Sequence, residues 1–349
     1  MIESLRHRPD LWDLFTRREE YGATALDRYG RFPYYRSRHR DVAHPAVSAY
    51  LIEQGLQVRY PEGKPFAVCL THDIDNVRYN LWHWAYEIAL ALRRRRAGTA
   101  GKLILHRLSR RINPLWNFAR TMELEARYGA KSTFFFLALD RGEEDFSFRI
   151  GELTDLLREI SRRGWEVGLH GGHKAWRDRD ALRRQKDRLE HALGQEVTGY
   201  RNHYLRFSTP TTWRLLAEAG FAYDSTFGYA DCVGFRNGMC HPFRPFDFDR
   251  GQSLDILEIP LAIMDCTLDA YMHLDERQAW TQVTMLVDTV ERYSGVLTVL
   301  WHNTHLMDEK LKFYERLLAY AAGKNAWLAS TGEIYRWWKA NDFLGQSSR

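Results

Sequence analysis

The feature that most constrains the fold is a repeated unit in which a short apolar run ends at an ionisable residue and a helical pattern follows. The clearest runs, with the residues that end them, are 66–75 (Asp73 and Asp75), 164–170 (His170) and 295–302 (His302). Strands that alternate with amphipathic helices pair in parallel, because each helix returns the chain to the same edge of the sheet. The sequence therefore predicts the α/β class, with a parallel sheet closed as a barrel.

Ionisable residues recur where these predicted strands stop. They are Asp73, Asp75, His170, Arg201, Asp224 and His302. In parallel α/β barrels the chemistry gathers at the carboxyl ends of the strands. The pattern therefore predicts one polar site built from segments that lie far apart in the chain.

The pair Asp73 and Asp75 is the most informative of these sites. Residues i and i+2 of an extended segment point to the same side, so both carboxylates would face one pocket. Two like charges at close range raise one pKa unless a cation lies between them. A histidine from another strand would complete a divalent metal site. The alternative is an aspartate that only caps the following helix.

Composition limits the class of protein. The chain has 349 residues, of which 45% are hydrophobic, enough for one large barrel or two ordinary domains. Its formal charge of +5 is too mild to indicate nucleic-acid binding. The four cysteines are scattered without a CxxC pair, and the N-terminus carries no apolar leader. No run approaches the roughly 18 apolar residues that span a bilayer, so a cytoplasmic protein is expected.

Three regions are expected along the chain. Residues 1–60 form an N-terminal extension that packs on the barrel, and residues 61–345 form the barrel itself. A helical insertion occupies about 78–128, after the first strand. Between positions 78 and 111 the chain has nine basic residues against one acid. Such a tract suits peripheral contact with an anionic membrane or a glycolipid, or else a solvated arginine face.

Six motifs, taken in order, resemble the polysaccharide deacetylase (NodB-homology, carbohydrate esterase family 4) superfamily. They are Thr71-His-Asp-Ile-Asp75, Ser132-Thr-Phe-Phe-Phe136, Glu166-Val-Gly-Leu-His170-Gly-Gly-His173, Tyr200-Arg-Asn-His-Tyr204, Ala219-Gly-Phe-Ala-Tyr-Asp-Ser225 and Leu297-Thr-Val-Leu-Trp-His302. The resemblance covers about residues 64–340. It implies a distorted (β/α) barrel of seven or eight strands that removes N-acyl groups from sugars with a divalent metal.

The resemblance also implies roles in proton transfer. Asp73 matches the general base, and Arg201 matches the arginine that orients it. Tyr204 falls where a backbone N–H helps to bind the oxyanion. His302 matches the general acid, and Asp224 would orient His302 or bind substrate.

The implied metal ligands are Asp75, His170 and a second histidine whose identity the sequence leaves open. In the family this histidine lies four residues after the first, but Lys174 occupies that position here and His173 lies one residue earlier. His173 would serve if a helical turn followed His170, because i and i+3 share a face. His203 is the rival, since it stands where the arginine motif usually has a proline. Zinc is the expected cation, with Co²⁺, Ni²⁺ or Mn²⁺ as alternatives.

The sequence thus predicts a metal-dependent hydrolase that removes an N-acyl (acetyl) group from an amino sugar of a polysaccharide or glycan precursor. One alternative is a divergent C–N hydrolase acting on a non-sugar amide or ureide. The other is a catalytically inactive barrel that binds a glycan or a membrane. In residues 231–249, a long irregular stretch, the aromatic and arginine side chains either line the substrate groove or pack over the barrel rim.

Overall fold

The computed structural model describes residues 1–78, 81–93, 98, 101, 104 and 113–345. A parallel sheet with the strand order β8-β5-β4-β3-β2-β1-β10-β9 forms its centre, and β11 also pairs with β1. The strands are β1 (Ala67–Ile74), β2 (Thr133–Leu137), β3 (Glu166–Gly171), β4 (Gly199–Asn202), β5 (Tyr223–Asp224), β8 (Leu257–Glu258), β9 (Leu261–Met264), β10 (Val296–Leu300) and β11 (Trp327–Ala329). Within the described residues no pairing joins β8 to β9. The predicted fold class is confirmed as a distorted barrel, open at this point.

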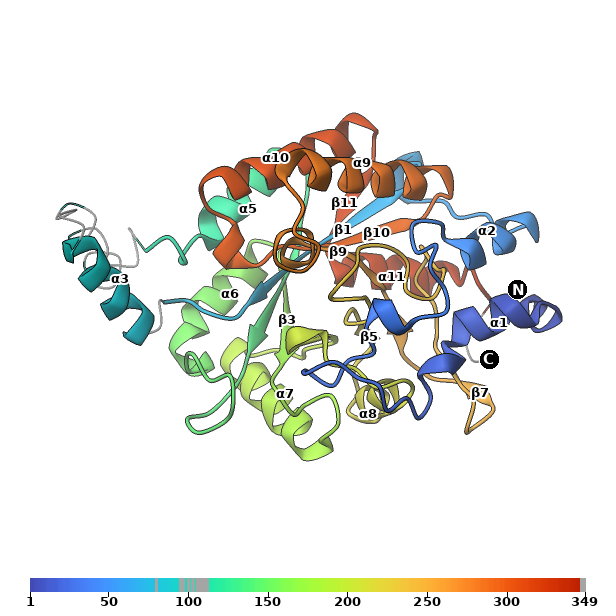
Figure 1. The fold of residues 1–349 in the computed structure, drawn as a ribbon, viewed down its shortest axis with the longest axis horizontal. Coiled ribbons are helices and arrows are strands. Elements are labelled where there is room, and N and C mark those ends of the chain that lie inside the picture. The colour runs from blue at the N-terminus through green and yellow to red at the C-terminus, as the bar shows by residue number, and fades with distance from the viewer. Residues whose placement is uncertain (79–80, 94–97, 99–100, 102–103, 105–112, 346–349) are drawn as a thin grey trace.

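Helices surround the strands (Figure 1). They are α5 (Phe118–Ala126), α6 (Thr154–Arg162), α7 (Arg179–Leu193), α8 (Thr211–Glu218), α9 (Glu276–Arg292), α10 (Asp308–Gly323) and α11 (Thr331–Asn341). Several begin at residues that satisfy the free N–H groups of the first turn, as Asp275 does before α9 and Ser330 before α11. A small hairpin, β6 (Phe246–Asp247) with β7 (Gln252–Ser253), lies outside the main sheet.

Every residue of β1 is buried, because one side of the strand packs against the surrounding helices and the other packs against side chains inside the barrel. The strand pairs in parallel with β10 on one side and with β2 on the other. Because all strands of this sheet run the same way, their carboxyl ends lie at one edge. The residues that follow β1, β3, β4, β9 and β10 therefore meet there.

Two elements differ from the sequence prediction. The apolar pattern predicts a strand over 254–260; the chain forms the shorter strand β8 within this range, and a further strand that was not predicted, β9, follows Pro260. Proline has no N–H to donate to a sheet, so the ladder breaks there. The expected helical tract from 81 to 128 is also interrupted. Its described part includes α3 (Leu81–Arg93), which Figure 1 shows beyond the barrel, and α5. The chain is not helical at Asn113-Pro114, before α5 begins.

Most of the basic residues of the tract at 78–111, expected to contact a membrane or glycolipid, lie outside the described residues. None of the helices in the described part of the chain is long and apolar enough to cross a membrane.

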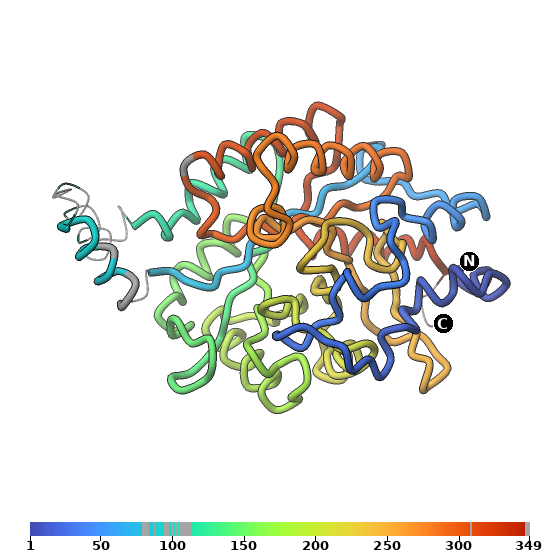
Figure 2. The backbone as a smooth tube through the Cα atoms, in the orientation of Figure 1, coloured from blue at the N-terminus to red at the C-terminus, as the bar shows by residue number. Residues whose placement is uncertain are grey.

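Residues 1–60 include α1 (Pro9–Thr16) and α2 (Ala46–Glu53) and lie against the segment 226–249 (Figure 2). A buried ion cluster joins the two segments. Glu20 Oε1 lies 2.8 Å from Arg17 Nε, and Glu20 Oε2 lies 2.7 Å from Arg236 Nη2. Phe235, Arg236 and Phe243 are buried, so these side chains pack over the barrel rim and do not line a substrate groove.

Replacing Glu20 by alanine is expected to destabilise the protein by about 3–5 kcal/mol, because the change leaves the buried guanidinium of Arg236 without its carboxylate and removes one of the two carboxylates paired with Arg17. Urea unfolding followed by circular dichroism measures the effect. Glu3→Ala is the matched control, since Glu3 pairs with Arg6 in an exposed position and its loss should cost about 1 kcal/mol or less. Equal effects of the two changes would show that the buried cluster does not hold the extension to the barrel.

Candidate metal centre

Three side chains from different strand ends form a group suited to a cation. Asp75 follows β1, His170 lies in β3, and His203 follows β4. Asp75 Oδ1 lies 3.3 Å from His170 Nε2 and 3.6 Å from His203 Nε2. One ligand atom from each residue lies within 4.8 Å of the others. We call these three residues the first cluster.

The first cluster fits a divalent cation in its chemistry. Asp75 Oδ1 and His170 Nε2 are buried and have no hydrogen-bond partner among the described residues. Burial disfavours a charged Asp75, but His203 and His170 outweigh it and hold the pKa of Asp75 well below its usual value. Burial likewise opposes a charged His203, yet Asp75 and Asp145 raise its pKa to about 9. A cation bound here would take the place of that proton.

The structure places His203, and not His173, in the first cluster. The chain after β3 forms a turn, and α7 begins only at Arg179, so the helical turn that would have brought His173 beside His170 is absent. His173 instead contacts two acids, with Nε2 3.0 Å from Glu144 Oε2 and Nδ1 3.4 Å from Asp145 Oδ2. His203 Nδ1 lies 3.1 Å from Asp145 Oδ2, which fixes the orientation of its ring.

His203→Ala is expected to reduce the Zn²⁺ held at the first cluster about 10-fold or more at limiting metal, because it removes one of three protein ligands. His173→Ala is the matched control, and its first cluster should hold as much Zn²⁺ as that of the wild type. Anomalous scattering at the first cluster, in crystals of each variant prepared with a single equivalent of Zn²⁺, measures both. Loss of metal in His173→Ala but not in His203→Ala would show that His173 is the ligand.

Asp73 lies beside the first cluster and next to an arginine. Its Oδ1 is 3.7 Å from Arg201 Nη1, and its Oδ2 is 3.6 Å from His170 Nε2. Arg201 is fully buried, donates to Thr71 Oγ1 and Ser225 Oγ, and lies over the ring of Phe135. The guanidinium is therefore held rigidly beside the carboxylate of Asp73.

His302 approaches the first cluster from the other side. Its Nε2 lies 3.8 Å from Asp75 Oδ2, and its Nδ1 lies 2.7 Å from Asp265 Oδ1. Burial disfavours the charged ring, but Asp265 and the neighbouring acceptors outweigh it and raise the pKa of His302 well above its usual value. Asp265 itself is buried, yet His302 and His305 hold its pKa at about 2. The pair is therefore an imidazolium held by a carboxylate.

Asp224, expected to orient His302 or to bind substrate, occupies a different place. It is fully buried, and its Oδ1 accepts from the backbone N–H and the hydroxyl of Thr226. Burial and the neighbouring Asp224 raise the pKa of Glu258 well above its usual value. The carboxylate that contacts His302 is Asp265 and not Asp224, which corrects the expectation that Asp224 orients His302.

A cavity of about 220 Å³ opens over these groups. Its walls include Asp73, Asp75, His203, Tyr204, Tyr271 and His302, together with Arg31 from the N-terminal extension. Arg31 donates to the backbone carbonyl of Tyr204 at 2.7 Å and to the hydroxyl of Tyr271 at 3.2 Å. The extension therefore braces the peptide group of Tyr204, whose backbone has a positive φ of 59°.

Sequence reasoning missed three residues of this site. Asp265 directly follows the apolar run of β9, which is the same pattern that singled out Asp73 and Asp75. Asp265 was missed because the predicted strand, 254–260, ends before β9 begins. Asp145 lies in a loop, and Arg31 lies in the extension. No local pattern marks either residue, because their roles depend on contacts between distant segments.

The profile of the family described as polysaccharide deacetylase matches residues 116–223. The fold is similar to that of a Mycobacterium smegmatis protein provisionally described as a polysaccharide deacetylase, with a TM-score of 0.57 and 20% identity over 84% of this chain and 96% of that one. The chain therefore resembles polysaccharide deacetylases in the sequence of that segment and in its fold. The family profile includes His170, Arg201 and His203, and the parallel pairing of β1 with β2 brings Asp73 and Asp75 to the same edge.

Other solved structures are less similar. A peptidoglycan deacetylase of Bacillus subtilis has a TM-score of 0.40 and 13% identity over 82% of this chain and 96% of that one. A family 4 pseudoenzyme of Bacillus anthracis has a TM-score of 0.39 and 12% identity over 79% of this chain and 66% of that one. No curated protein sequence matches the chain.

Proposed function

We propose that this protein is a divalent-metal-dependent hydrolase that removes the N-acetyl group from an amino sugar. The observation that carries the proposal is the arrangement around Asp75. Two histidines face one of its oxygens, while an aspartate–arginine pair and a histidine–aspartate pair lie on different sides of the first cluster. Amide hydrolysis needs such an arrangement, because a base must activate water and an acid must protonate the departing amine.

Asp75, His170 and His203 would hold the cation, which supplies Lewis-acid polarisation of the acyl carbonyl and lowers the pKa of water. Asp73 takes a proton from the attacking water, and Arg201 holds that carboxylate in place. The buried position of Asp73 limits competition from solvent. The backbone N–H of Tyr204 donates to the oxygen on which negative charge develops.

His302 gives the proton from Nε2 to the amine nitrogen as the C–N bond breaks. Asp265 holds the other ring nitrogen, so the ring keeps the orientation in which Nε2 faces the cavity. The ring of Tyr204 borders the cavity and is stacked between His203 and Tyr29, with centroids 4.1 Å and 4.7 Å away, so both of its faces are covered. The match to the polysaccharide deacetylase profile supports an acetylated carbohydrate as substrate.

The test is acetate release from a panel of N-acetylated amino sugars and their oligomers by protein loaded with Zn²⁺, Co²⁺, Mn²⁺ or Ni²⁺. We expect release that a chelator abolishes and that Asp75→Asn lacks. Release only from non-sugar amides or ureides would replace the sugar substrate by another C–N bond. Glycan binding with no release under any of the four metals would overturn the enzymatic proposal.

A further inference from the structure

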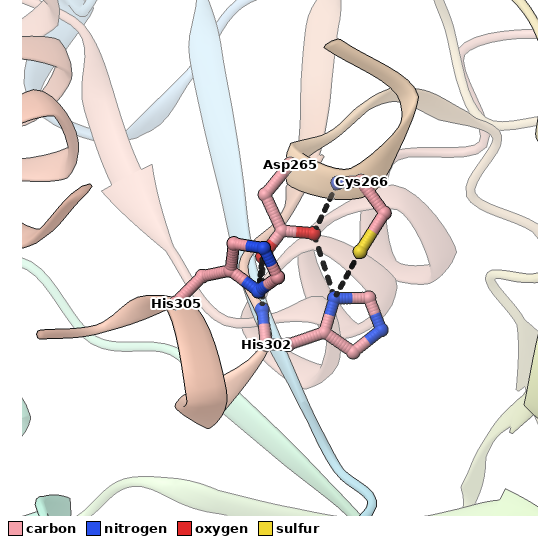
Figure 3. A group of neighbouring side chains, drawn as sticks. All are labelled: Asp265, Cys266, His302 and His305. Atoms are coloured by element: carbon pink, nitrogen blue, oxygen red, sulfur yellow. Dashed lines mark hydrogen bonds and ion pairs between the residues drawn. The ribbon is translucent and has the colours of Figure 1, made fainter. Parts of the chain in front are cut away.

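A second group of metal-ligating side chains lies beside the first cluster, and Figure 3 shows its four members turned toward one another. They are Asp265, Cys266, His302 and His305, which we call the second cluster. Asp265 Oδ1 is 2.7 Å from His302 Nδ1, and Asp265 Oδ2 is 3.4 Å from His305 Nδ1. Cys266 Sγ lies 3.8 Å from His302 Nδ1. One ligand atom from each of the four lies within 4.8 Å of the others.

The ligand set of the second cluster differs from that of the first. One thiol, two imidazoles and one carboxylate make a four-ligand set of the kind that holds Zn²⁺ tetrahedrally, and the sulfur favours soft divalent cations over Mg²⁺ or Ca²⁺. Asp265 and Cys266 directly follow β9, while His302 and His305 follow β10. These two strands are neighbours in the sheet, so the backbone presents all four residues from a rigid edge.

We propose that the second cluster is a binding site for a second, soft divalent cation such as Zn²⁺, distinct from the site at Asp75. Binding replaces the thiol proton of Cys266 and any proton on the ligating ring nitrogens, and those protons are released to solvent. His302 lies between the two sites, because Nδ1 faces the second cluster while Nε2 faces Asp75 at 3.8 Å.

A consequence for turnover rests on the proposed function. A cation on Nδ1 takes the place that a proton holds when His302 acts as a charged acid. The ring then offers Nε2–H from a formally neutral imidazole, which gives up a proton far less readily. The second cation should therefore inhibit the deacetylase, and zinc would be activating at one equivalent and inhibitory in excess.

The binding test uses Co²⁺ in place of Zn²⁺, because a thiolate bound to Co²⁺ gives a charge-transfer absorption that nitrogen and oxygen ligands do not. We expect wild-type protein to bind two equivalents, with this absorption present. Cys266→Ser and His305→Gln should each bind one equivalent, and Cys266→Ser should lack the absorption. Cys232→Ser is the matched control, because Cys232 is another partly buried free cysteine outside the cluster. Asp75→Asn should lose one equivalent and keep the absorption.

A second arm follows acetate release as Zn²⁺ rises from one equivalent to a tenfold excess, with each variant compared with its own rate at one equivalent. Wild type and Cys232→Ser should be inhibited, and Cys266→Ser should resist. A wild-type protein that binds one equivalent without thiolate absorption would overturn the second site. Two equivalents with the absorption but no acetate release would uphold the site and refute the proposed function instead.

Discussion

Asp73→Asn is expected to lower kcat by about 10²–10⁴-fold while the protein keeps its metal. The substitution preserves the shape of the side chain and removes the group that accepts a proton from water. Asp73 contacts Arg201 and His170 at 3.7 Å and 3.6 Å, but it is not a member of the first cluster. Acetate release and elemental analysis on the same preparation separate loss of the base from loss of the cation.

Asp187→Asn serves as the control for this change, since Asp187 lies exposed on α7. It should match the wild type in both measurements. An unchanged kcat in Asp73→Asn would remove Asp73 from the mechanism. Loss of metal together with activity would make Asp73 a ligand.

Asp265→Asn is expected to lower kcat by a similar factor of about 10²–10⁴ and to change its pH dependence. Asp265 is the main group that raises the pKa of His302, against the opposing effect of burial. Removing its charge lowers that pKa, so His302 loses its proton at a lower pH. The alkaline limb of the kcat profile should therefore move to lower pH. The difference in kcat between Asp265→Asn and the wild type should grow as pH rises.

The profile is measured at one equivalent of metal, so that the second cluster stays empty. Asp224→Asn is the informative comparison, because Asp224 contacts Thr226 and not His302. It should leave the alkaline limb in place. A shift in Asp224→Asn and none in Asp265→Asn would reverse the assignment of the residue that orients the acid.

The fold followed from the sequence because its signals are local and repeated. The strands β2 and β10 are short runs of mostly apolar residues, and β1 is buried over all eight of its residues. The strand β9 was not predicted, because the predicted strand 254–260 ended at Pro260. Only the pairing of β9 with β10 shows that the chain forms a new strand after the proline.

The candidate site followed from the sequence only in part. Asp73, Asp75, His170 and His302 terminate recognisable strands, so their convergence could be predicted. The choice between His173 and His203 depended on whether a helix or a turn follows β3, and spacing alone does not decide that. Asp265 and Arg31 are defined by their contacts with His302 and Tyr204, which come from sheet pairing and from docking of the extension.

The most direct test of the central claim is an anomalous difference map from crystals of the protein loaded with one equivalent of Zn²⁺. We expect a single strong peak bounded by the Asp75 carboxylate and the Nε2 atoms of His170 and His203, with His173 turned toward Glu144. A peak elsewhere, or an ordered site in which Asp75 and His170 lie too far apart to share a cation, would contradict the account.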